Sequence, residues 1–152
     1  MLSCHDVADY FLAVSRADEE AGDPISNMTL QKLLYYAQGF YLALNDKPLF
    51  NERIEAWTHG PVVPDVYHRF KQHGAGPLPM PAEIDLDRIP DHTAELLDEV
   101  YKVYGQFSGW KLREMTHAEP PWAETQQGGA ISRNALSIFF KTRIVDGEGE
   151  EP

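Results

Sequence analysis

Cysteine and basic residues are scarce in this 152-residue sequence. The single cysteine, Cys4, cannot form a disulfide within the chain, which is typical of proteins from a reducing compartment. Thirteen Lys and Arg residues stand against 24 Asp and Glu residues, which gives a formal net charge of −11 at pH 7. Proteins that bind nucleic acid or anionic membranes usually present a basic face. The charge balance therefore argues against nucleic acid and against a membrane surface as partners.

Long hydrophobic runs are also missing. No apolar stretch approaches the roughly 18 residues that a transmembrane helix requires. The first ten residues contain neither a basic segment nor an apolar core, so no secretory signal peptide is expected. Together with the single cysteine, these absences predict a cytoplasmic protein with no membrane partner.

Hydrophobic residues nevertheless make up 43% of the chain and aromatic residues 11%, which is enough to build a core. The length suits one domain. Residues 145–152 contain four acidic residues interspersed with two glycines. We therefore expect a domain over residues 1–144 and a flexible acidic tail over residues 145–152. The tail holds −4 of the −11, so the domain keeps a net charge of −7.

Helical periodicity dominates the chain. Apolar residues at helical spacing predict helices that begin near residues 3, 27, 64, 91, 109 and 132. The helix over residues 27–45 is apolar over most of its circumference, which is usual for a helix surrounded by other elements. Its predicted polar side consists of Gln31, Lys32, Gln38 and Gly39. The pattern predicts a mainly α single compact domain of five to six helices around this central apolar helix.

Three segments depart from the helical pattern. Residues 53–57 alternate polar and apolar side chains and predict a short β-strand or hairpin, followed by a turn over residues 59–61. Four prolines within residues 75–90 predict an irregular connection. The sequence EPPW at residues 119–122 should end the helix that begins near residue 109.

Signatures of catalysis and of metal binding are missing. The sequence has no phosphate-binding loop, no G-x-S-x-G motif and no paired C-x-x-C motif. Cys4 lies at the start of the first predicted helix, where a helix dipole favours a thiolate, but nothing in the sequence fixes a base beside it. A small enzyme that uses His59, His117 and Glu119 is an alternative. We expect no catalytic residue, no cofactor and no metal.

Three tryptophans, Trp57, Trp110 and Trp122, lie at the edges of predicted elements. Aromatic residues at such positions serve either as core packing or as anchors of a protein–protein interface. Core packing is the more common role, and the sequence alone leaves both open.

The order of several short motifs resembles that of a known family. In chain order, the motifs are MTLQKLLYYAQG at residues 28–39, EAWTHGPV at 55–62, PDVY at 64–67, LREMTH at 112–117 and PW at 121–122. This succession resembles the Panacea domain, the SocA-type antitoxin domain that is also seen in phage-associated proteins. The resemblance extends over residues 7–144.

The resemblance implies a protein that binds and neutralises a toxin encoded beside it. A SocA-type member also acts as an adaptor that delivers its toxin to the ClpXP protease, so ClpXP is an alternative partner and delivery an alternative function. A binding protein of either kind needs no catalytic group. The candidate partner-binding residues lie around the predicted strand and helix ends: Trp57, His59, Pro61, Val62, Tyr67, Trp110 and Trp122.

Overall fold

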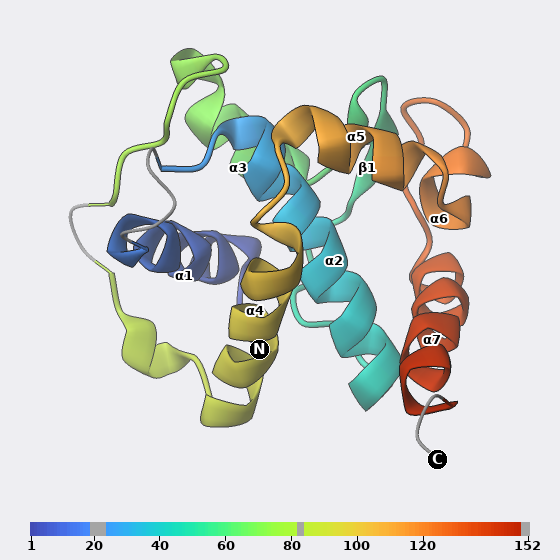
Figure 1. The fold of residues 1–152 in the computed structure, drawn as a ribbon. Helices are drawn as coiled ribbons and strands as arrows, with labels where there is room; N and C mark the ends of the chain where they lie inside the picture. The colour runs from blue at the N-terminus through green and yellow to red at the C-terminus, as the bar shows by residue number, and fades with distance from the viewer. Residues whose placement is uncertain (19–23, 82–83, 150–152) are drawn as a thin grey trace.

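The computed structural model describes residues 1–18, 24–81 and 84–149 of the chain. Within these ranges it contains seven α-helices and one two-stranded antiparallel sheet, which confirms the predicted mainly α fold class (Figure 1). In chain order the elements are α1 (Cys4–Ala17), α2 (Asn27–Asn45), β1 (Glu55–Trp57), β2 (Gly60–Val62), α3 (Pro64–Phe70), α4 (Asp91–Tyr104), α5 (Gly109–His117), α6 (Pro120–Ala123) and α7 (Arg133–Gly149). Two short 3-10 helices, Lys71–His73 and Leu86–Arg88, lie between α3 and α4.

Helix α2 forms the centre of the domain, as its apolar circumference predicts. In Figure 1 it runs through the middle of the molecule, with α1 and α4 on one side and α7 on the other. Side chains on every face of α2 are buried. Gly39 allows α7 to approach closely, because a Cβ atom at this position would overlap the ring of Phe140. This glycine is therefore a packing residue and not part of a polar surface.

The predicted polar side of α2 is wrong, since Gln31, Lys32 and Gln38 are each no more than 2% exposed. Gln38 Nε2 donates to the carbonyl oxygen of Phe50 at 2.8 Å, and Gln38 Oε1 accepts from the N–H of Leu49 at 2.7 Å. Gln31 Oε1 accepts from the N–H of Val63 at 2.8 Å. Buried polar groups are stable when they are hydrogen-bonded. These amides therefore fix the segments that wrap around α2.

Serine caps set the beginnings of three helices. Ser3 caps α1 through a capping box, in which its hydroxyl accepts from the N–H of Asp6 at 3.2 Å and its own N–H donates to the Asp6 carboxylate at 2.9 Å. Ser26 and Ser108 cap α2 and α5 in the simpler way, each accepting from the N–H three residues further along. Residues of both first turns line the cleft of the candidate site.

Strands β1 and β2 form a hairpin in which Trp57 lies opposite Gly60. The predicted turn over residues 59–61 is misplaced, because Gly60 and Pro61 already belong to β2. Gly60 has a backbone φ of +117°, which residues other than glycine rarely adopt. A Cβ atom at Gly60 would also lie 2.6 Å from Cε of Lys32. The hairpin therefore rests directly on the central helix.

The C-terminal part differs from the prediction in the number of its helices. Residues 119–122, expected only to end a helix, contribute to the short helix α6, because prolines fit the first turn of a helix. Helix α7 runs over Arg133–Gly149, and residues 150–152 lie outside the described residues. The flexible acidic tail over residues 145–152 stays a prediction. The additional helix α6 accounts for the difference between the expected five to six helices and the seven in the described chain.

Candidate functional site

A cleft of about 680 Å³ opens between the first turns of α2 and α5, the β1–β2 hairpin and the chain that follows α3. These elements gather in the upper part of the molecule in Figure 1, where α5 crosses above α2. Sites that bind ligands commonly have volumes of about 300–1,000 Å³. The cleft is therefore large enough to receive several side chains of another molecule.

Aromatic side chains form the walls of the cleft. Trp57 from β1 meets Tyr67 from α3 edge to face, with ring centroids 5.0 Å apart. Trp110 from α5 also lines the cleft and is 60% exposed. The ring of His59 lies edge-on to it at a centroid distance of 5.8 Å. Exposed tryptophans beside a pocket are typical of interface anchors.

Lys32 from α2 also lines the cleft, yet its side chain is only 1% exposed. Its ammonium group donates to the carbonyl oxygen of Pro61 at 3.3 Å. Burial lowers the pKa of Lys32 from 10.5 to about 7, and the nearby positive charge of Arg113 acts in the same direction. A buried ammonium group beside a single neutral acceptor is unfavourable, so this position favours the approach of negative charge.

Other cationic and imidazole groups surround Lys32. Arg113 Nε donates to His59 Nδ1 at 3.0 Å, and its guanidinium group lies 4.9 Å from the ring centroid of Trp110. His117 Nε2 is buried and has no hydrogen-bond partner among the described residues. Burial lowers the pKa of His117, and the positive charges of Arg113 and Lys32 lower it further. Neither Arg113 nor His117 lines the cleft itself, and His117 stacks on Trp122 behind it, with ring centroids 3.9 Å apart. These groups add positive potential around Lys32 from behind the cleft wall.

Acidic side chains do not line this cleft anywhere in the described chain, although the whole sequence contains 24 of them. Lys71, which follows α3, adds an exposed ammonium group at the edge. The cleft is thus a locally basic surface on a molecule with a net charge of −11. A low-dielectric cleft lined by one sign of charge concentrates ligands of the opposite sign.

The structure gathers the seven predicted partner-binding residues in one region. Five of them line the cleft: Trp57, His59, Val62, Tyr67 and Trp110. The other two lie behind it, since Pro61 is buried and Trp122 Nε1 donates to the carbonyl oxygen of Trp57 at 2.8 Å. Contact of these residues with a partner stays a prediction.

Sequence reasoning missed Lys32, because lysine is rarely buried and its position was assigned to a polar face. The apolar circumference of α2 could have indicated the burial of Lys32, since a helix that is surrounded on all sides buries its polar residues as well. Gln127 and Gly128, which also line the cleft, were missed for another reason. The segment that contains them pairs with β1, where the N–H of Ala56 donates to the carbonyl oxygen of Gly129 at 2.9 Å. Such long-range pairing leaves no local pattern.

The alternative enzyme would need His59, His117 and Glu119 to face one common space. Instead, the two carboxylate oxygens of Glu119 accept hydrogen bonds from the hydroxyls of Tyr35 at 2.8 Å and Tyr36 at 2.9 Å in the core. Burial raises the pKa of Glu119. His59 accepts from an arginine at the surface. Glu119 therefore lies in the core, apart from the surface position of His59, and joins α2 to the junction of α5 and α6.

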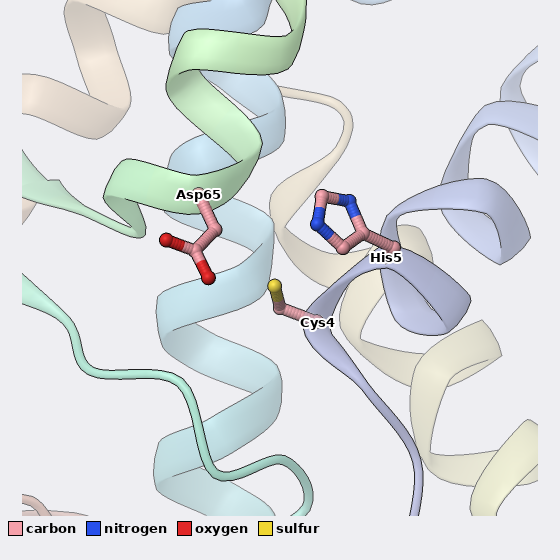
Figure 2. A group of neighbouring side chains, drawn as sticks. All are labelled: Cys4, His5 and Asp65. Carbon is pink, nitrogen blue, oxygen red and sulfur yellow. The ribbon is translucent and has the colours of Figure 1, made fainter.

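A second group of chemically active side chains lies away from the cleft. The ligand atoms of Cys4, His5 and Asp65 are all within 4.8 Å of one another (Figure 2). These atoms are metal-type donors, but burial and the negative charges of Glu52 and Asp65 raise the pKa of the Cys4 thiol to about 12. The guanidinium group of Arg69 also lies 3.4 Å from His5 Nδ1. The raised pKa keeps the thiol protonated and disfavours a thiolate nucleophile at this position.

Comparison with known protein families identifies the family of the chain. Residues 30–123 match the family described as "Antitoxin SocA-like, Panacea domain". The chain belongs to this family. Its Panacea domain contains Lys32, the hairpin and α5, and with them most of the cleft.

Among curated proteins, the Panacea-domain chain is similar to antitoxin SocA of Caulobacter vibrioides (strain NA1000 / CB15N), with 53% identity over 51 residues. That stretch is 34% of this chain and 27% of the relative, so the match spans about a quarter of the relative's length. No solved structure matches the chain. No helix in the described ranges is long and apolar enough to cross a membrane.

Proposed function

We propose that this protein is an antitoxin that neutralises a cognate toxin by direct protein–protein binding, with the cleft and its rim as the contact surface. The observation that carries the proposal is the position of the exposed Trp110 beside the aromatic cleft, within a domain of an antitoxin family. The name of the relative, antitoxin SocA, supports the same role.

The geometry suits binding better than catalysis. A stable interface buries about 1,200–2,000 Å² in total, and its central aromatic anchors usually supply most of the affinity. Trp57 and Tyr67 hold each other in place, whereas Trp110 projects from the first turn of α5. In this proposal a toxin segment enters the cleft between them. The complex then covers the toxin's active site or holds the toxin in an inactive state.

Co-expression with the product of the neighbouring gene tests the proposal. We expect cells that carry the catalytically intact neighbouring toxin to grow only when this protein is present. The two proteins should then elute together in size-exclusion chromatography. A toxin that kills equally with and without this protein would contradict the proposal.

Two matched variants test the contact surface. Trp110→Ala should weaken toxin binding at least tenfold, because this side chain is a central anchor in the proposed interface. Ile138→Ala is the control, since Ile138 on α7 is 61% exposed and does not line the cleft. Both changes remove a similarly exposed apolar side chain. Equal affinities of the two variants for the toxin would show that the interface lies elsewhere.

Delivery of the toxin to the ClpXP protease is the alternative mechanism. It predicts that the half-life of the toxin falls when this protein and the protease are both present in the cell. Simple sequestration predicts an unchanged half-life. Pulse-chase measurements in cells with and without the protease separate the two mechanisms.

A further inference from the structure

We propose that the cleft binds an acidic side chain of the partner polypeptide, an Asp or Glu flanked by apolar residues, with its carboxylate directed toward Lys32. The inference rests on the proposed function, because it names the chemistry of the toxin segment that enters the cleft.

The first argument is the incomplete pairing of Lys32. An ammonium group has three N–H donors, and within the described chain the Pro61 carbonyl oxygen is its hydrogen-bond acceptor. The side chain is 1% exposed. Buried charges in proteins are normally paired with an opposite charge. A carboxylate at this position would supply both the missing acceptors and the missing negative charge.

The second argument is the charge of the surroundings. Arg113, His59 and His117 interact electrostatically around Lys32. Lys71 adds a second ammonium group, exposed at the edge of the cleft. No acidic side chain lines the cleft among those same residues. The site therefore complements an anion, although the molecule as a whole would repel one.

The third argument selects a polypeptide side chain over a small anion. A volume of about 680 Å³ is much larger than a single carboxylate or phosphate group needs. Most of the remaining wall is apolar and aromatic, including Trp57, Tyr67 and Trp110. Exposed residues, Ala75 and Gly128, lie at its edges. An extended chain can therefore place an acidic side chain at the base and its apolar neighbours against the walls.

The fourth argument is that binding of a carboxylate beside Lys32 should be coupled to the uptake of a proton. Near pH 8 most Lys32 side chains are neutral in the free protein, because burial lowers the pKa of Lys32 to about 7. A carboxylate within about 4–6 Å favours the charged form and raises the pKa of the ammonium group. Binding of an acidic segment should therefore take up a proton from the buffer at pH 8.

Selection from a peptide library tests the inference on the full-length protein without any toxin. Random heptapeptides are displayed with their carboxyl ends fused to the carrier, so that no free terminal carboxylate is present. We expect the selected peptides to share one Asp or Glu between apolar residues. Replacing that residue with Asn or Gln in the synthetic, amidated peptide should weaken binding at least tenfold.

Variants of the protein locate the contact. Lys32→Met should bind the acidic peptide and its amide analogue equally, whereas Lys111→Met should keep the wild-type preference. Lys111 is exposed on α5 and does not line the cleft, so this control removes the same charge elsewhere. Calorimetry at pH 8 in buffers of different ionisation enthalpy should show proton uptake with the wild-type protein and none with Lys32→Met.

Several outcomes would overturn the inference. These are a selection that yields no peptide, peptides without an acidic residue, equal binding of the acidic and amide forms, or a preference that survives in Lys32→Met. Binding only of inorganic phosphate, or only of peptides with a free terminal carboxylate, would also overturn it. Each of these results leaves toxin neutralisation untouched, whereas a toxin that kills regardless of this protein refutes the proposed function and not the peptide preference.

Discussion

Raising the pH from 7 to 8.5 should increase the free energy of unfolding, because Lys32 is buried close to its protonation midpoint. The pKa of its ammonium group is about 7 in the folded protein and 10.5 when exposed. Over this interval the unfolded chain keeps the proton while the folded protein releases it, and stability rises with pH wherever the unfolded state binds more protons. For one proton with these two pKa values, the free energy of unfolding rises by about 1.6 kcal/mol between pH 7 and pH 8.5.

Other groups set the limits of this interval. Below pH 7 His117, whose pKa is lowered by burial, also contributes to the pH dependence. Above about pH 8.5 the exposed thiol of the unfolded chain loses its proton, whereas the folded Cys4, with a pKa of about 12, keeps it. That difference lowers stability with rising pH and opposes the effect of Lys32. Urea unfolding followed by tryptophan fluorescence should therefore be measured at closely spaced pH values between these limits.

The Lys32→Met variant isolates the cause. It should lose the rise in stability with pH, and at pH 7 it should be as stable as the wild type or more so, because replacing a buried ion with an apolar side chain is often neutral or stabilising by about 1–4 kcal/mol. Lys111→Met should keep the wild-type slope, since its ammonium group is exposed. A flat wild-type profile, or an unchanged slope in Lys32→Met, would refute the reasoning.

Three further substitutions test the packing that supports the cleft, each by urea unfolding. Gly39→Ala should cost about 1–3 kcal/mol or more, because the new methyl group overlaps the Phe140 ring; wild-type stability would show that α7 can move away freely. Glu119→Ala should cost at least about 2 kcal/mol, because it leaves two buried tyrosine hydroxyls without their acceptor, and a neutral effect would mean that water replaces the carboxylate. Gly60→Ala should destabilise the protein by about 1–3 kcal/mol through its positive φ and its contact with Lys32; an unchanged midpoint would argue against the tight seating of the hairpin.

Features that depend on neighbours in the chain could be predicted from the sequence. The central position of α2 follows from its apolar circumference, and the caps at Ser3 and Ser108 follow from local hydrogen-bonding chemistry. The short strand signal before Trp57 correctly indicated the hairpin. The prolines of α6 were interpreted only as a helix stop, although proline also fits a first helical turn.

Features that depend on distant contacts could not be predicted. Glu119 meets Tyr35 and Tyr36 across 84 and 83 positions of the chain. Lys32 is buried because the β1–β2 hairpin, about 29 positions further along the chain, covers it. The carbonyl oxygen of Pro61 in that hairpin accepts a hydrogen bond from the Lys32 ammonium group. Periodicity reports which side of a helix is apolar, but not what covers it. Three of the candidate aromatic residues, Trp57, Tyr67 and Trp110, nevertheless line the same cleft.

The hydrogen bonds from Tyr35 and Tyr36 to Glu119 have a consequence for protein engineering. They join α2, which carries Lys32, to the end of α5, which carries Trp110, so the two sides of the cleft share one fixed frame. The hairpin turn is linked to the same frame, because His59 accepts from Nε of Arg113 on α5 at 3.0 Å. The turn before α7 is linked to the hairpin, since Gln127 Nε2 donates to the Thr58 hydroxyl at 2.7 Å. Under the proposed function, substitutions in these turns that leave the two hydrogen bonds in place should change the preference for a partner while the core beneath them keeps its shape. Directed evolution confined to the two turns would be an economical way to retarget the domain.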